Sequence, residues 1–162
     1  MGFNPAIKYD PITDPKKLYN RALYWLSKRD YSISDFQKKL DKVCEDERMK
    51  SELLERLIEN DWLSEERYIL AFIRSKTSAG LGPYRIINDL KQHGVKSQDA
   101  EPHLDAQTTD WFEQAKETYQ RKYGRSEIGD HKERAKRFRY MQYRGFSIDQ
   151  INYAMSADDE LA

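Results

Sequence analysis

The chain has 162 residues, 38% of them hydrophobic and 35% charged, and its 28 Lys and Arg residues balance 28 Asp and Glu residues. This composition supports a packed core and excludes wholesale disorder, while seven Gly and five Pro are too few for the turns of a strand-rich sandwich. A lone cysteine, Cys44, excludes an internal disulfide framework or a cysteine zinc site, and no apolar run approaches the ~18–20 residues that span a bilayer.

The first third of the chain predicts an irregular arm followed by three helices. Residues 1–13 are rich in turn formers and lack periodicity, whereas Asp14-Pro15 is typical of a helix start. A break at residues 30–32 separates the first helix from the second, which either Ser32 or Ser34 can cap. Apolar residues at helical spacing predict these helices at about 15–29, around Phe36, Leu40 and Val43, and at about 49–60.

The middle of the chain predicts a fourth and a fifth helix. Ser64 can cap the fourth, because the two glutamates that follow it stand in a first turn, where the helix dipole favours acids. Residues 78–83 interrupt the helical pattern, and Pro83 suits the first turn of the fifth helix. Gly94 is expected to end that helix as a C-cap or left-handed residue.

Four more elements complete the predicted chain. A sixth helix, capped by Ser97, is expected to be short (97–105), because Pro102 fits a helix only near its first turn. Three helices are predicted in the last third, with Gly145 as the break between the second and third of them. Their expected ranges are about 111–123, about 132–141 and about 147–155.

The predicted helices form a weak internal repeat. Leu40, Leu90 and Met141 each end a middle helix, at separations of 50 and 51 residues, and Lys91–Val95 aligns with Gln142–Phe146. We therefore expect an all-α fold, an elongated and curved tandem array of three three-helix repeats. The expected ranges are 1–13 for the arm, 14–63, 64–106 and 107–156 for the repeats, and 157–162 for an acidic tail.

The residue pattern predicts no catalytic, cofactor or metal site. Cys44 stands among acids, which blunts a thiol as a nucleophile. The three histidines, His93, His103 and His131, are scattered without metal-ligand spacing. Gly80-Leu81-Gly82 lacks the further glycine or lysine of phosphate-binding loops, so it is interpreted as a helix break. Four aromatic residues at apolar periodic positions are expected in the core: Trp25, Trp62, Trp111 and Phe138.

Charge is segregated along the chain: residues 1–44 and 116–144 are basic, while residues 45–66 and 145–162 are acidic. Because Lys and Arg side chains suit phosphates and carboxylates, we hypothesise that the basic sets bind an anionic partner; the alternative is that they only solvate helix faces. The hypothesis covers Lys28, Arg29, Lys38, Lys39 and Lys42 in the first repeat, Arg85 and Lys91 in the second, and Lys132, Arg134, Lys136, Arg137, Arg139 and Arg144 in the third.

Helical spacing divides the third basic set into two stripes. Lys132, Lys136 and Arg139 fall on one stripe at 3.6 residues per turn. Arg137 and Arg144 lie about two turns apart on a neighbouring stripe. If the array curves, Arg85 and Lys91 would extend this surface across the middle repeat.

Ordered sequence blocks extend over about residues 18–155. The most specific block runs from Arg74 through Gly80-Leu81-Gly82-Pro83-Tyr84-Arg85-Ile86 to Leu90 and Gly94-Val95. Further blocks are Ala22-Leu23, Arg29-Asp30-Tyr31-Ser32, Lys39-Leu40, Asp110-Trp111, Arg121-Lys122-Tyr123-Gly124 and Arg144-Gly145-Phe146. Residues 60–68 are similar to a joint of the form G-[LY]-[IL]-D-[DE]-x-R-[FY], with Asp61 at the usual Gly and Ser64 at the usual Asp. In their order and spacing these blocks together resemble the RecX family.

The resemblance implies a regulator, mainly an inhibitor, of the RecA recombinase in homologous recombination, DNA repair and the SOS response. Family members bind the RecA–DNA filament within its helical groove and limit its extension, ATPase and strand exchange. We therefore expect a cytoplasmic, monomeric protein that is not an enzyme, needs no cofactor and does not enter membranes. Its expected partner is the RecA nucleoprotein filament, with direct binding of single- or double-stranded DNA as an addition.

Two rival functions remain open from the residues alone. One is a free-standing helical DNA-binding protein that uses its basic stripes on phosphates and shows a steep salt dependence. The other is a generic helical adaptor for another protein. A helix-turn-helix docking mode is conceivable for the first rival because three-helix units recur, but the sequence offers no base-reading set.

Overall fold

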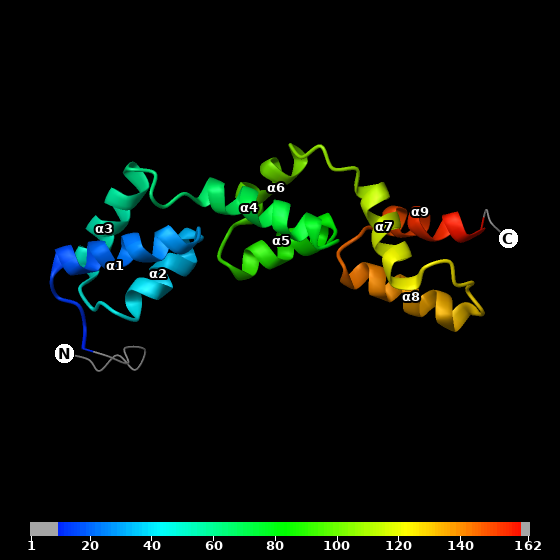
Figure 1. The fold of residues 1–162 in the computed structure, drawn as a ribbon, viewed down its shortest axis with the longest axis horizontal. Coiled ribbons are helices and arrows are strands. Elements are labelled where there is room, and N and C mark those ends of the chain that lie inside the picture. Colours follow the sequence, from blue (N-terminus) through cyan, green and yellow to red (C-terminus); the bar gives the residue numbers. More distant parts are fainter. Residues whose placement is uncertain (1–9, 160–162) are drawn as a thin grey trace. The chain divides into compact units, whose positions relative to one another are not determined.

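The computed structural model describes residues 10–159, with side chains to Ser156, and contains nine α-helices and no strand in that range (Figure 1). This confirms the all-α class and the expected succession of three-helix repeats. The helices are α1 (Pro15–Lys28), α2 (Ile33–Asp41), α3 (Glu47–Glu59), α4 (Glu65–Ser78), α5 (Pro83–Gln92), α6 (Ser97–Asp105), α7 (Trp111–Tyr123), α8 (His131–Tyr143) and α9 (Ile148–Asp159).

We name the helix triplets repeat 1 (α1–α3), repeat 2 (α4–α6) and repeat 3 (α7–α9). By packing, the chain divides differently, into one unit up to Leu70 together with His93–Val95, and a second unit made of the rest. The short segment after α5 therefore belongs with repeat 1 although it follows a helix of repeat 2. The predicted repeat boundaries, and the elongated and curved form of the array, stay predictions.

Side-chain caps start several helices where the sequence predicts them. The Asp14 carboxylate accepts from the backbone N–H of Lys16 at 3.0 Å, and the Ser32 hydroxyl accepts from that of Asp35 at 3.1 Å. Ser32, rather than Ser34, is therefore the N-cap of α2. A capping hydroxyl satisfies one of the backbone donors that the first turn of a helix leaves unpaired.

The predicted cap of α6 is wrong. The N-cap is Lys96, whose carbonyl accepts from the N–H of Ala100 at 3.1 Å, and no side chain caps the helix. Ser97 is already the first helical residue. Pro102 lies in the second turn of α6 rather than the first, and the helix nevertheless spans the predicted residues.

Parts of the predicted N-terminal arm and of the predicted acidic tail belong to the fold. The N–H of Ile12 donates to the carbonyl of Val43 at 2.7 Å, and the Ile12 side chain packs on the core of repeat 1. Residues 1–9 of the expected arm lie outside the described residues. Residues 157–159 of the expected acidic tail continue α9, which ends at Asp159, and residues 160–162 lie outside the described residues.

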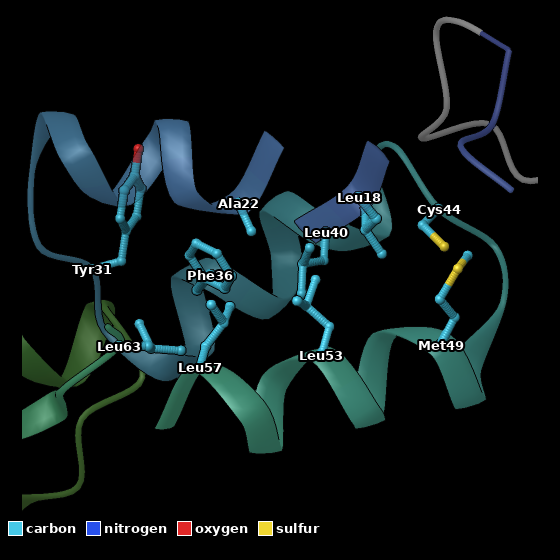
Figure 2. Packing of buried hydrophobic residues seen from close by; sticks show 10 residues of the cluster. All are labelled: Leu18, Ala22, Tyr31, Phe36, Leu40, Cys44, Met49, Leu53, Leu57 and Leu63. Atoms are coloured by element: carbon cyan, nitrogen blue, oxygen red, sulfur yellow. The ribbon is translucent and has the colours of Figure 1, made fainter. Parts of the chain in front are cut away.

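The core of repeat 1 lies where α1, α2 and α3 meet (Figure 2). Leu18, Phe36 and Leu57 are fully buried, and burial of each such side chain stabilises the fold by about 1.5–3 kcal/mol. Cys44 is also buried in this cluster. The cluster consists of Leu18, Ala22, Tyr31, Phe36, Leu40, Cys44, Met49, Leu53, Leu57 and Leu63.

Trp62 corrects the prediction that all four large aromatics are core residues, because 51% of its surface is exposed. It follows Asp61, whose φ of 57° turns the chain sharply at the end of α3. The N–H groups of Trp62 and Leu63 both donate to the Leu57 carbonyl, and Leu63 enters the core instead. Trp25, Trp111 and Phe138 are partly buried.

Candidate functional site

The basic residues predicted in repeat 1 lie over aromatic rings. The Arg29 guanidinium is 4.3 Å from the centre of the Tyr31 ring, and the Lys39 ammonium is 4.8 Å from that of Trp25. Lys28 lies 5.1 Å from the ring of the exposed Tyr24. Such cation–π contacts hold each charge at a defined place on the surface. The remaining members of the set are also exposed: Lys38 on α2, and Lys42 at the C-cap of that helix.

Acidic residues of the same repeat are paired with other partners. Asp30 pairs with Arg67 at 2.8 Å and Asp41 with Lys50 at 2.7 Å, while Asp35 contacts the His93 ring at 2.7 Å. Consequently none of the five predicted cations of repeat 1 forms an ion pair with a described residue. We call these five, with Tyr24, Trp25 and Tyr31, the basic–aromatic surface. Unpaired cations of this kind produce a positive potential that attracts anionic groups.

The structure also brings together one predicted stripe of repeat 3. Lys132, Lys136 and Arg139 line the same shallow hollow of about 450 Å³ on α8, and Arg134 is exposed on the same helix. Glu133 also lines the hollow, so the surface is basic without being free of acids. Whether these residues bind a partner stays a prediction.

Arg137 corrects the expectation of a second accessible stripe, because only 3% of its surface is exposed. Its guanidinium donates to the Tyr119 hydroxyl at 2.8 Å, to the Ser126 carbonyl at 2.9 Å and to the Glu133 carboxylate at 3.0 Å. Burial lowers the pKa of Arg137, but the hydrogen bonds to Tyr119 and Glu133 outweigh burial and raise it above its ordinary value. The residue stabilises repeat 3 and is not available to a partner.

Arg85 and Arg144 lie at a contact between repeats 2 and 3 that we call junction 2. It joins residues 82–85 at the start of α5 to residues 143–146 after α8. The N–H of Gly82 donates to the Arg144 carbonyl at 2.8 Å, and that of Tyr84 donates to the Gly145 carbonyl at 3.1 Å. The Arg85 guanidinium donates to the Tyr143 carbonyl at 3.1 Å and pairs with Asp89 at 3.0 Å. Lys91, by contrast, is exposed on α5.

An equivalent contact, junction 1, joins residues 32–35 at the start of α2 to residues 93–95 after α5. The Ser32 hydroxyl donates to the His93 carbonyl at 2.7 Å, and the ring Nδ1 of His93 lies 2.7 Å from the Asp35 carboxylate. Tyr68 lies edge-on to the His93 ring. Burial, and then the charge of Asp35, raises the pKa of Tyr68 to about 12, so its phenol stays protonated at neutral pH.

Each junction depends on a glycine in the left-handed region. Gly94 has φ 77° and Gly145 has φ 100°, as the helix-end interpretation of both residues predicts. A Cβ added at Gly94 would overlap the Ser34 side chain, and one added at Gly145 would overlap Arg85. The helix-end interpretation does not include the second role of both glycines, as contact points between repeats. The available signal was that the two glycines align in the repeat.

Within residues 10–156, no group of three or more His, Cys, Asp and Glu side chains is placed to hold a metal ion. Among the described helices, none is both long enough and apolar enough to cross a membrane.

Comparison with known proteins identifies relatives over most of the chain. The family models described as "RecX, second three-helix domain" and "RecX, third three-helix domain" match residues 64–104 and 108–155. The chain is 35% identical to the "Regulatory protein RecX" of Ectopseudomonas mendocina, covering 92% of this chain and 99% of the relative. It is 36% identical to that of Actinobacillus pleuropneumoniae, covering 86% and 91%.

Solved structures share the fold. The crystal structure of RecX from Lactobacillus salivarius aligns with a TM-score of 0.75 at 24% identity, covering 90% of this chain and 97% of the other. A second crystal structure, of a regulatory protein RecX, aligns with a TM-score of 0.74 at 22% identity, covering 88% and 71%. At this identity the structural match establishes the shared helical architecture.

Proposed function

The chain belongs to the RecX family of regulatory proteins, and we propose that it binds the RecA–DNA filament and inhibits RecA. The observation that carries the proposal is the 35% identity to a regulatory protein RecX across 92% of the chain. In the proposed action the protein limits filament extension, and with it the DNA-dependent ATPase and strand exchange. It acts in the cytoplasm, where RecA works on DNA.

No chemical step is needed for this function. A protein that binds one assembly state of a filament better than another shifts the equilibrium toward the state it prefers. Three linked repeats offer several weak contacts on one chain, and each contact raises the effective concentration of the next. The basic–aromatic surface supports the proposal because it supplies cations that no described acid neutralises.

The direct test is the DNA-dependent ATPase of RecA titrated with the purified protein. We expect ATP turnover to fall at substoichiometric to equimolar protein, because each bound molecule blocks further filament growth. Electron microscopy of the same samples should show shorter filaments. Unchanged turnover together with unchanged filament length at saturating protein would contradict the proposal.

A second candidate, direct binding of DNA, is favoured by one observation: the cations of repeat 1 form no described ion pair, and Lys28 lies beside the exposed ring of Tyr24, on which a base can stack. Its test is binding to single- and double-stranded DNA without RecA at several salt concentrations. Affinity should fall steeply with salt, because bound phosphates release counterions.

Charge reversal separates the two candidates. Lys28→Glu with Arg29→Glu should weaken DNA binding, while Lys96→Glu with Arg125→Glu, which reverses two exposed cations outside the predicted sets, should not. If the first pair abolishes DNA binding and spares inhibition of RecA, the basic–aromatic surface serves DNA only. If both activities fall together, it serves the filament.

A further inference from the structure

Junctions 1 and 2 perform the same structural task at equivalent positions of the repeat. In the register that aligns Leu40 with Leu90 and Leu90 with Met141, Ser32 corresponds to Gly82 and His93 to Arg144. In both junctions the first residue of the pair donates a hydrogen bond to the carbonyl of the second, at 2.7 Å and 2.8 Å. Each junction can therefore serve as a control for the other.

The residues around the two junctions differ in a way that this structural task does not explain. Junction 2 carries Tyr84, Tyr143 and Ile148, which are 67%, 71% and 59% exposed. We call these three residues the junction-2 rim. The equivalent residues at junction 1 are polar and smaller: Ser34, Gln92 and Ser97. Since junction 1 forms without large apolar side chains at these positions, the rim is not required to hold the repeats together.

The rim borders two adjoining hollows. One, of about 370 Å³, lies between α5 and the end of α8 and is lined by Tyr84, Tyr143 and the amides of Asn88 and Gln142 among others. The second, of about 500 Å³, lies toward the start of α9 and contains Ile148. Tyr84 and Gln142 line both hollows, so they form the wall between them.

Charges in the two hollows disfavour a nucleic acid. The cation in the lining, Arg85, is already paired with Asp89 at 3.0 Å, and the second hollow adds the carboxylate of Asp149. No unpaired Lys or Arg side chain lines either hollow. A phosphate would therefore meet net negative charge here, in contrast with the basic–aromatic surface.

The chemistry of the rim instead fits a protein. Exposed Tyr beside Arg, with few free charges, matches the enrichment of Tyr and Arg at protein-binding hot spots. Asn and Gln amides both donate and accept, and so can pair with the main chain of a partner. Tyr143 is also held in advance: the Arg85 guanidinium lies 4.7 Å from its ring, which reduces the entropy lost on binding.

We propose that the junction-2 rim is a protein-docking surface, at which Tyr84 and Tyr143 receive an uncharged aromatic or aliphatic side chain and adjacent main chain from a RecA subunit of the filament. The inference rests on the proposed function, because it names the partner as RecA. It divides the molecule into a charged surface for phosphates and a neutral surface for protein.

The test replaces the rim with its junction-1 equivalents in the full chain: Tyr84→Ser, Tyr143→Gln and Ile148→Ser together. The measurement is affinity for RecA filaments assembled on single-stranded DNA with a non-hydrolysable ATP analogue, beside affinity for the bare DNA. Since loss of a hot-spot residue typically costs tenfold or more, we expect at least about 30-fold weaker filament binding. Bare DNA binding should stay unchanged. Trp62→Ser, which removes an exposed aromatic outside the rim, should leave both affinities unchanged.

Each result decides the matter. Parental affinity of the triple variant for the filament overturns the inference and leaves the proposed function intact. Equal loss of filament and bare DNA binding also overturns it, because the rim then contacts nucleic acid. A parent chain that binds no filament overturns the proposed function and the inference with it. If the triple variant loses its helical circular dichroism signal, Tyr143→Gln alone decides, with about tenfold weaker filament binding expected.

Discussion

The two inter-repeat junctions hold equivalent parts of the chain together by different chemistry. Junction 1 depends on side chains, because the Ser32 hydroxyl bonds the His93 carbonyl and the His93 ring contacts Asp35. Junction 2 depends mainly on the main chain, through the N–H groups of Gly82 and Tyr84, with one side-chain hydrogen bond from the Arg85 guanidinium to the Tyr143 carbonyl. A repeat protein can thus preserve one contact geometry while its side chains change, which leaves residues at the second junction available for a partner.

The largest effect on the stability of a junction is expected at Gly145. Gly145→Ala forces an L side chain into φ 100° and places its Cβ against the backbone N of Arg85. We expect a loss of about 3 kcal/mol in the free energy of unfolding, measured with urea, since left-handed strain and a main-chain overlap add. Arg85→Gly in the same chain should not restore stability, because the backbone N remains. Full rescue by that second change would show that junction 2 does not depend on the main chain.

Gly94→Ala should destabilise less, by about 2 kcal/mol, from the same strain and an overlap with a side chain. The overlapping atoms are Cβ and Oγ of Ser34, with the nearest backbone atom farther away. Ser34→Gly should therefore recover part of the loss at junction 1. The measurement is the urea midpoint of the single and double variants. If the double variant is no more stable than Gly94→Ala, the loss of stability comes from the backbone conformation alone.

Ser32→Ala removes two hydrogen bonds at once, because the same hydroxyl caps α2 and donates to His93. A cap and a buried hydrogen bond together predict a loss of about 1.5 kcal/mol in the free energy of unfolding. Ser27→Ala is the control, since that hydroxyl donates to a carbonyl within α1 at an exposed position. Equal effects of the two variants would contradict the side-chain basis of junction 1.

The smallest expected effect on stability is that of high pH, which acts through Tyr68 at junction 1. The raised pKa of Tyr68 means that the folded state disfavours the phenolate, so the stability it contributes is fully present below the ordinary value near 10 and is lost progressively as pH rises toward about 12. We expect a loss of roughly 1 kcal/mol over that range, measured by urea unfolding, which Tyr68→Phe removes. If the dependence of the unfolding free energy on pH is unchanged in Tyr68→Phe, other groups cause the effect.

Local signals in the sequence predicted the helices well, because caps and breaks act within a few residues. Ser32, Pro83 and Gly94 each mark a helix end by their own chemistry. The predictions that were wrong concern residues whose burial is decided by distant parts of the chain. Arg137 is buried because Tyr119 and Ser126 come to it from α7 and the loop that follows.

A signal for that burial was present in the sequence. Arg137 lies four residues before Met141, a core residue on the same helical stripe, which places Arg137 on the buried side of α8. Trp62 shows the reverse case, since the left-handed Asp61 changes the phase of the chain and exposes a side chain that periodicity places inside. The junctions could not be predicted from any single helix, because each one joins the start of one helix to a segment about 60 residues further along the chain.

Electron microscopy of RecA filaments mixed with this protein tests the central claim most directly. The account predicts continuous extra density along RecA–DNA filaments and a shorter mean filament length at equimolar protein, with the density reduced by the triple rim variant. Filaments without added density, and of unchanged length at saturating protein, would contradict the account.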